Sequence, residues 1–360
     1  MSDLKNARLI LENGVEFKGK SFGYSQSVAG EVVFNTAMTG YPESLTDPSY
    51  KGQILVATFP LIGNYGVPKP FIENNLLKFF ESDKIHISGL IISDYSLEYS
   101  HWNAEKSLSN WLKINKIPGI FGIDTRALTK ILRESGCMLG KIIIEDQEVD
   151  WYDPNVHNLV DMVSIKEKIK YGDGRYQIMM VDCGVKYNII RSLLRFDTTI
   201  IRVPWDYDYT ADEYDGLFIT NGPGNPEMCV KTIKYLEYSL GKDKPIFGIC
   251  LGSQLLGIAS GASTFKLKYG HRSHNQPVIE HKTNKCYITS QNHGYAVDHT
   301  KLNADFMPFY TNLNDNTCEG IRHKSKPFFA TQFHPEASGG PTDTAFLFEN
   351  YINEIKGNKG

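Results

Sequence analysis

The chain has 360 residues, 41% hydrophobic and 22% charged content, and a formal net charge of −3. This length fits two packed cores better than one, and this composition excludes an intrinsically disordered chain. Lysine and arginine are dispersed along the chain and form no basic stripe, so we expect no nucleic acid partner.

The first residues, MSDLKNARLILENG, lack a basic segment followed by a long apolar run, and no segment is apolar over the length of a bilayer. We therefore expect no membrane partner and a cytoplasmic protein. The six cysteines are scattered without a CxxC pair, which argues against a disulfide framework and a zinc cluster. Free thiols fit a reducing compartment.

Residues 1–150 mix short β-rich runs with helical patterns, which predicts a smaller α/β domain. The β-rich runs are ARLILENG, GEVVFNTAM, GQILVATF and HISGLIIS, and the helical patterns are AEKSLSNWLKI and TRALTKILRES. Residues 151–175 are polar, lack a sustained strand pattern and end in a Gly-Asp-Gly turn. We interpret them as a linker.

Residues 176–360 alternate apolar strands with helical segments, beginning with YQIMMVDCG, KYNIIRSLLR and TTIIRVPW. This alternation predicts an α/β domain with a mostly parallel, doubly wound sheet, whose crossovers are right-handed. Ligand sites in such sheets lie at the carboxyl ends of the strands. We therefore expect the functional residues in the loops that follow the strands.

The segment GICLG at 248–252 ends an apolar strand and opens a helical pattern. This is the setting in which a G-x-nucleophile-x-G turn presents a side chain at the top of a sheet. The positive end of the helix dipole would favour the thiolate form of Cys250. An isolated cysteine is more often a buried structural residue, but the strand-turn-helix setting favours a nucleophile here.

A thiolate nucleophile needs a proton carrier and a group that orients it, and QFHPE at 332–336 supplies both after the strand FFATQF. His334 is the candidate base and acid. Glu336, two residues later on the same side of an extended chain, can hold its ring in the productive tautomer. An H-x-E pair alone is weak evidence, and its pairing with GICLG makes it persuasive.

Attack on an amide carbonyl creates an oxyanion, which two backbone N–H groups can stabilise. The amide of Leu251 follows the nucleophile, and the amide of Gly222 lies in the NGPG turn after the strand GLFIT. Both are candidate donors. A metal site is not expected, because the His271 and His274 pair in GHRSHN lacks cysteine or carboxylate partners at ligand spacing.

With these motifs, the C-terminal half resembles the class I (triad-type) glutamine amidotransferases, whose signatures look like NGPG, GICLG and HPE in this order. The whole chain resembles the small subunits of glutamine-hydrolysing carbamoyl-phosphate synthases. That wider resemblance rests on N-terminal segments such as GEVVFNTAMTGYPESLTDPSYKGQILVATFPLIGNYG and GIDTRALTKILRESG. It covers nearly all of residues 7–356.

The resemblance implies that Cys250 forms a γ-glutamyl thioester with L-glutamine and releases ammonia, with His334 moving protons and Glu336 supporting it. It also implies a set of positions that contact the glutamine substrate. These are Ser49, Gly222, Gly224, Leu251, Gln254, Asn292, Gly294 and Tyr295. Ser49 would reach in from the N-terminal domain.

The implied partner is a large subunit that binds ATP and Mg²⁺ and makes carbamoyl phosphate for arginine or pyrimidine biosynthesis. The complex would be a heterodimer or a higher oligomer of heterodimers. This chain has no G-x-x-x-x-G-K-[ST] phosphate loop, so we expect it to carry no cofactor. Two other interpretations are a freestanding γ-glutamyl hydrolase and an inactive regulatory scaffold.

Two segments depart from the commoner family pattern. Ser253 stands where many members have histidine, and Ser273, His274 and Gln276 stand in GHRSHNQPV where GHRGGNHPV is usual. These changes leave the three triad residues intact. They concern the packing behind the nucleophile and the loop contacts to a partner.

Overall fold

The computed structural model describes residues 4–359, and the chain divides into two compact units, Met1–His157 and Asn158–Gly360. Each unit has its own hydrophobic core. Within residues 4–359, none of the helices combines the length and the apolar character that a bilayer crossing requires.

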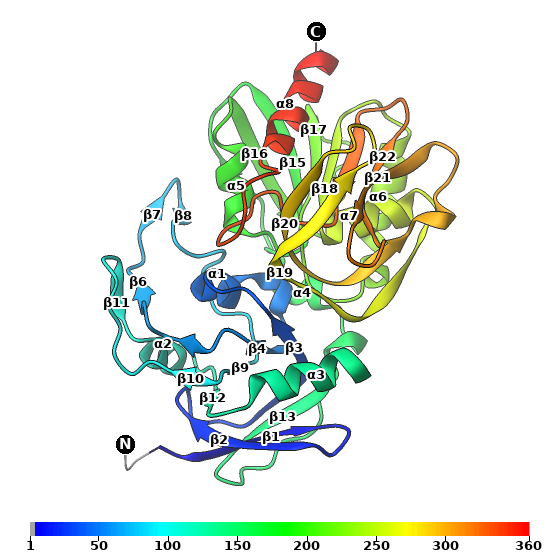
Figure 1. Ribbon diagram of the computed structural model, residues 1–360. Coiled ribbons are helices and arrows are strands. Elements are labelled where there is room, and N and C mark those ends of the chain that lie inside the picture. The colour runs from blue at the N-terminus through cyan, green and yellow to red at the C-terminus, as the bar shows by residue number, and fades with distance from the viewer. Residues whose placement is uncertain (1–3, 360) are drawn as a thin grey trace. The chain divides into compact units, whose positions relative to one another are not determined.

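The first unit is built on a closed β-barrel, whose strands follow one another in the order β1, β13, β3, β4, β9, β12 and β2 (Figure 1). Their bounds are β1 Asn6–Leu11, β2 Glu16–Ser21, β3 Val28–Asn35, β4 Gln53–Ala57, β9 Gly89–Ile91, β12 Gly119–Phe121 and β13 Met138–Ile144. Parallel pairing joins β3 to β4, β4 to β9 and β9 to β12. The expected small α/β domain is therefore a mixed barrel with helices around it.

Helix α3 shows how local sequence sets an element of this unit. The Asp124 side chain accepts a hydrogen bond from the Ala127 amide, and Gly136 ends the helix with φ 101°. Leu128 and Leu132 are buried on one face, which packs toward β3 and β4. The helices are α1 Tyr41–Thr46, η1 Pro48–Tyr50, α2 Leu108–Ile114, α3 Thr125–Ser135 and η2 Pro154–Val156.

Three short ribbons complete the first unit. They pair β5 with β10, β6 with β11, and β7 with β8. Their bounds are β5 Leu61–Ile62, β6 Val67–Pro68, β7 Ile72–Glu73, β8 Leu76–Leu77, β10 Asp94–Tyr95 and β11 Ala104–Lys106.

The second unit contains one large sheet in the order β14, β16, β15, β17, β18, β23, β22, β20, β19 and β21. Its strands are β14 Ile169–Tyr171, β15 Tyr176–Asp182, β16 Thr198–Pro204, β17 Gly216–Ile219, β18 Ile246–Ile249, β19 Ser263–Glu280, β20 Cys286–Asp298, β21 Phe306–Asn312, β22 Cys318–His323 and β23 Phe328–Thr331. Pairing is parallel from β16 through β15, β17 and β18 to β23. The pairs at both ends are antiparallel.

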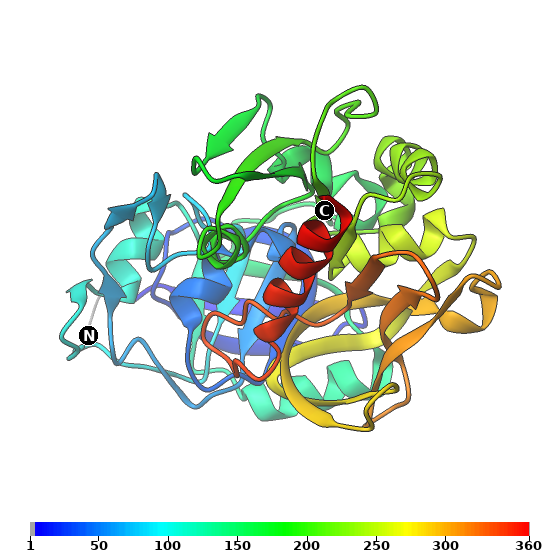
Figure 2. The same cartoon turned by 90° about the horizontal axis from the view of Figure 1, so that it is seen from above.

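Helices cover both faces of the parallel strands, as the prediction of a doubly wound domain requires. On one face lies α8, the red helix of Figure 2. Its Tyr351 ring lies 5.8 Å from the ring of Phe218 and 5.7 Å from that of Phe247. On the other face, Leu236 of α6 and Leu255 of α7 belong to the buried core of this unit. The helices are α4 Leu159–Val163, α5 Tyr187–Leu193, η3 Pro226–Met228, α6 Val230–Leu240, α7 Leu251–Ala259, η4 His299–Lys301 and α8 Phe346–Lys359.

Two features differ from the sequence prediction. The expected linker 151–175 contains α4 and the strand β14, which pairs with β16 at Ile169 and Arg202, so most of that segment belongs to the second unit. The sheet also continues beyond β23 as a long antiparallel hairpin of β19 and β20. The parallel centre and the fold class are confirmed, with a larger antiparallel part than the alternating pattern indicated.

Candidate active site

Cys250 occupies a tight turn between β18 and α7. Its φ of 55° and ψ of −104° are strained for a residue with a side chain, a conformation typical of a nucleophile turn. The Cys250 amide donates to the Thr331 carbonyl at 2.8 Å. A Cβ on Gly252 would lie 2.2 Å from the Ile219 carbonyl oxygen, so this glycine lets the helix approach the sheet.

His334 and Glu336 form a buried hydrogen-bonded pair just after β23. His334 Nδ1 lies 2.6 Å from Glu336 Oε1, and both side chains are at most 1% exposed. The His334 amide donates to the Ser290 carbonyl at 2.9 Å, which anchors the segment to β20. The carboxylate thus holds one ring nitrogen and leaves Nε2 for another partner.

His334 and Cys250 lie close enough for the cysteine to influence the pKa of the imidazole. Burial and the positive charge of Lys186 lower the pKa of His334, but Glu336 and Cys250 together outweigh them and raise it. Nε2 is buried and forms no hydrogen bond of standard geometry within residues 4–359. Catalytic hydrogen bonds are often long before substrate binds, so this geometry is compatible with proton transfer by His334.

Lys186 is a member of the site that the sequence reasoning missed. Its Nζ lies 3.0 Å from Glu336 Oε1 and donates to the Ala337 carbonyl at 2.9 Å, with the lysine side chain only 7% exposed. Burial raises the pKa of Glu336, but Lys186 and His334 outweigh burial and lower it. The available signal was the position of Lys186, four residues after β15 at the same edge of the sheet.

The two candidate oxyanion donors lie beside each other. A Cβ on Gly222 would meet the Leu251 side chain at 2.8 Å and the Cys183 carbonyl at 2.1 Å, so the NGPG turn lies against the start of α7. Within the described chain, neither the Gly222 amide nor the Leu251 amide donates a hydrogen bond. Both donors are therefore available to an oxyanion, and their role stays a prediction.

Three of the predicted glutamine contacts meet near Cys250. Gln254 of α7 donates through Nε2 to the Tyr295 carbonyl at 3.0 Å and to Gln332 Oε1 at 3.1 Å. Cys250 Sγ lies 3.7 Å from the Asn292 carbonyl oxygen. The nucleophile, α7 and the Asn292–Tyr295 segment of β20 are thus joined by hydrogen bonds.

The remaining predicted contacts lie in three places. Gly294 is within the same segment of β20, and a Cβ there would lie 3.3 Å from Arg272 Nη2. Gly224, with φ 85°, lies in the NGPG turn against Leu159. Ser49 lies in η1 of the first unit, where its amide donates to Asp47 Oδ1 at 2.9 Å.

A second cluster of titratable side chains lies in the antiparallel part of the sheet. His271, His293 and Glu319 place one ligand-type atom each within 4.8 Å of one another. His274, which the sequence pattern offered beside His271, is not part of this cluster. Both ring nitrogens of His271 already face carboxylates, at 3.2 Å to Glu319 and 2.8 Å to Asp315, which favours a charge network over a metal centre.

His274, one of the departures from the family pattern, lies near the charges of the site. Burial lowers its pKa, and the positive charges of Lys186 and His334 lower it further, to about 4. The side chain is therefore neutral at pH 7. His274 also belongs to the electrostatic surroundings of His334, and the expectation about packing and partner contacts stays a prediction.

Two family models match the chain, one in each unit. The model for the carbamoyl-phosphate synthase small chain, CPSase domain, matches residues 9–142, and the model for class-I glutamine amidotransferases matches residues 179–354. The arginine-specific carbamoyl phosphate synthase small chain of Saccharomyces cerevisiae is 49% identical to this chain over 364 residues. That alignment covers 97% of this chain and 89% of the yeast chain.

Longer proteins are equally similar. The multifunctional protein CAD of Squalus acanthias is 52% identical, with 96% of this chain and 16% of that protein covered. Carbamoyl-phosphate synthase (ammonia), mitochondrial, of Mus musculus is 50% identical, with 99% of this chain and 24% of that protein covered. The chain therefore spans a minor part of these two relatives and nearly all of the yeast chain.

Proposed function

This chain belongs to the carbamoyl-phosphate synthase small-chain family, and from that membership and its site geometry we propose that it hydrolyses L-glutamine to glutamate and ammonia. The observation that carries the proposal is the His334–Glu336 hydrogen bond of 2.6 Å beside a cysteine in a strained strand-to-helix turn. The same arrangement of nucleophile, base and orienting carboxylate serves acyl transfer on several folds.

In the proposed reaction, the Cys250 thiolate attacks the side-chain amide carbon of glutamine, and the oxygen becomes an oxyanion held by the amides of Gly222 and Leu251. Collapse of this intermediate breaks the C–N bond, while His334 gives its proton to the leaving ammonia. The product is a γ-glutamyl thioester. His334 then takes a proton from water, which attacks the thioester and releases glutamate and the thiolate.

Glu336 and Lys186 have supporting roles in this proposal. Glu336 holds the His334 ring and stabilises the imidazolium that forms during each proton transfer. Lys186 keeps Glu336 ionised inside the unit, where an unpaired carboxylate would be costly. Gln254, Asn292, Gly294 and Tyr295 would contact the substrate with Gly224, and the predicted role of Ser49 stays a prediction.

The proposed partner is a large subunit that uses ATP, Mg²⁺ and bicarbonate to make carbamoyl phosphate, with this chain carrying no cofactor of its own. Ammonia in neutral water is mostly protonated and not nucleophilic, so an enclosed route to the partner is the useful arrangement. We propose a heterodimer, or an oligomer of heterodimers, working in the cytoplasm. The free thiols of Cys137, Cys183, Cys229, Cys250, Cys286 and Cys318 are consistent with a reducing compartment.

Similarity by itself does not establish glutamine use, because the mouse relative is named for ammonia. The residues of this chain carry that step. The decisive measurement is glutamate release by the purified chain, alone and with a purified large subunit. We expect weak activity alone, a rise on assembly, and a loss of about 10³-fold or more in Cys250→Ser, because serine is a poorer nucleophile in this setting.

The matched control is Cys286→Ser, which changes an exposed cysteine of the same unit and should keep full activity. Equal activity with and without the large subunit would instead favour a freestanding γ-glutamyl hydrolase. Absence of activity in both conditions would favour a regulatory scaffold. Retention of activity in Cys250→Ser would contradict the thioester mechanism.

A further inference from the structure

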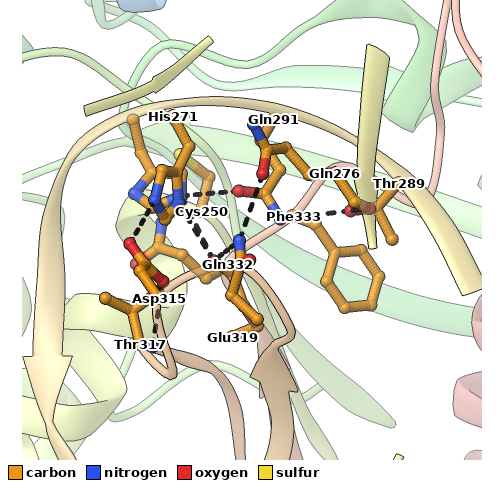
Figure 3. A network of polar contacts seen from close by, with 12 residues as sticks. Cys250, His271, Gln276, Thr289, Gln291, Asp315, Thr317, Glu319, Gln332 and Phe333 are labelled. Atoms are coloured by element: carbon orange, nitrogen blue, oxygen red, sulfur yellow. Dashed lines mark hydrogen bonds and ion pairs between the residues drawn. The ribbon is translucent and has the colours of Figure 1, made fainter. Parts of the chain in front are cut away.

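A buried polar network connects four elements of the antiparallel part of the sheet (Figure 3). His271 of β19 stands between two carboxylates, with Nε2 at 2.8 Å from Asp315 Oδ2 and Nδ1 at 3.2 Å from Glu319 Oε1. His293 of β20 places Nε2 at 3.7 Å from the same Glu319 oxygen. The His271 and His293 rings meet edge to face with centroids 4.9 Å apart.

One proton on His271 supplies the positive charge that faces the two carboxylates of this network. The Glu319 side chain is fully buried, and its Oε2 has no hydrogen-bond partner within residues 4–359. A buried carboxylate is strongly disfavoured unless a cation lies next to it. A doubly protonated His271 supplies that cation, because each of its two N–H groups then has a carboxylate acceptor.

The network continues directly into the segment expected to bind glutamine. His293 Nδ1 lies 2.8 Å from the Tyr295 carbonyl, and the same carbonyl accepts a hydrogen bond from Gln254 Nε2 at 3.0 Å. The residue before His293 is Asn292, whose carbonyl is the hydrogen-bond acceptor of Cys250 Sγ. Movement of the His293 ring would therefore move the backbone that faces both Cys250 and Gln254.

We propose that protonated His271, clamped by Glu319 and Asp315, is a positioning residue that holds the Asn292–Tyr295 segment of β20 in its glutamine-binding conformation. It acts through Glu319 and His293 and contacts neither Cys250 nor His334. This inference rests on the proposed glutaminase function and adds a source of substrate affinity to it. The expected consequence of losing the clamp is weaker glutamine binding with an intact nucleophile.

The titratable groups facing His271 support a stable proton there. They are Asp315 in the turn between β21 and β22, Glu319 of β22 and His293 of β20. Burial lowers the pKa of His271, but the hydrogen bonds that its ring donates to Asp315 and Glu319, with their negative charges, outweigh burial and raise it to about 9. Burial lowers the pKa of His293, which leaves that ring neutral and able to orient by hydrogen bonds.

The test measures glutamine affinity by calorimetry in a Cys250→Ser background, so that no substrate is consumed. His271→Asn should weaken the affinity roughly tenfold, because small displacements of a binding segment are costly. Adding Glu319→Gln to His271→Asn should restore much of the affinity, since it removes a buried carboxylate that has lost its cation. The control is His281→Asn, an exposed histidine in the turn of the same hairpin, and it should bind normally.

Two further measurements separate positioning from general damage. In the background that retains Cys250, its alkylation by iodoacetamide should keep its rate in His271→Asn. The glutamine affinity of the Cys250→Ser protein should fall as pH rises through about 9, and the part of this fall that changes in Asp315→Asn reports the proton of His271, because His334 and the ammonium group of glutamine titrate alike in both proteins. Asp315→Asn removes the partly exposed outer carboxylate, so it should fold if His271→Asn does not, and it should move this pH midpoint downward.

Unchanged affinity in both His271→Asn and Asp315→Asn would overturn the inference, as would an equal loss of alkylation rate and affinity. A divalent metal present at one equivalent in the purified protein would also overturn it, because a metal ion would then occupy the place given to the proton. Failure of the proposed function is distinguishable from these results. It would appear as wild-type protein that binds no glutamine and, with its large subunit, releases no glutamate.

Discussion

Two regions of the second unit place charged side chains around Cys250 in different ways. In the first, Lys186, Cys250, His334 and Glu336 each follow the carboxyl end of a parallel strand. In the second, His271, His293, Glu319 and Asp315 come from an antiparallel hairpin, a neighbouring strand and a turn. The parallel edge brings reacting groups together by topology, whereas the hairpin relies on a buried charge pair to hold its conformation.

If the first region performs the chemistry and the second holds the substrate, their variants should fail in different kinetic constants. Replacing the base in His334→Asn should lower kcat for glutamate release by about 10³-fold, and Glu336→Gln should lower it by about 10²-fold. In both variants KM should change little, since neither residue binds glutamine in the ground state. Steady-state assays of the assembled complex measure both constants.

His281→Asn serves as the control for these variants, because it removes an exposed imidazole that lies outside both regions. It should match wild type in kcat and KM. A His334→Asn variant with normal kcat and a raised KM would reverse the roles assigned to the two regions.

The residues at the parallel edge could be predicted from the sequence because short local motifs mark them. The turn at Cys250 is marked by one glycine two residues away on each side, and the H-x-E pair directly follows an apolar strand. The geometry at Glu336 agrees with that expectation. Lys186 was missed because one lysine after a strand carries no motif, and its ion pair with Glu336 joins residues 150 positions apart.

Most of the hairpin region could not be predicted from the sequence, because its signals are not local. Strand β19 contains FKLKY, whose apolar and polar residues alternate and which was a strand signal that the prediction overlooked, followed by GHRSHN, which is polar on both faces and has no such signal. No motif marks Glu319 as a functional residue. Its contact with His271 depends on the pairing of β19 with β20, which spans register shifts on both sides of residues His271–Ser273.

The ion pair of Lys186 with Glu336 tests how much a buried charge pair contributes to stability compared with an exposed pair. Lys186→Met removes the buried cation beside Glu336 and should lower the free energy of unfolding by about 3 kcal/mol, because a buried carboxylate loses a partner. Urea unfolding at pH 7 measures this change. Combining Lys186→Met with Glu336→Gln should recover part of the loss.

Lys166→Met is the matched control. Lys166 pairs with Asp161 at 2.9 Å, but its side chain is 68% exposed, so its loss should cost less than about 1 kcal/mol. Equal destabilisation by the two lysine variants would mean that burial adds nothing to the Lys186 pair.

The smallest expected effect is the dependence of stability on alkaline pH, and it tests the hairpin region alone. The pKa of His271 is raised from 6.5 to about 9 in the folded protein, so its contribution to stability is complete below pH 6.5 and is lost as pH rises through 9. Between pH 7 and 9 the free energy of unfolding should fall by about 2 kcal/mol for a buried group.

In Asp315→Asn the folded pKa of His271 should fall toward 6.5, so the decline in unfolding free energy should begin at lower pH and be smaller. His334 also has a raised pKa, but it does not contact Asp315, so it contributes equally to both proteins and cancels in their difference. Identical pH profiles for the two proteins would show that His271 is not clamped by Asp315 in solution.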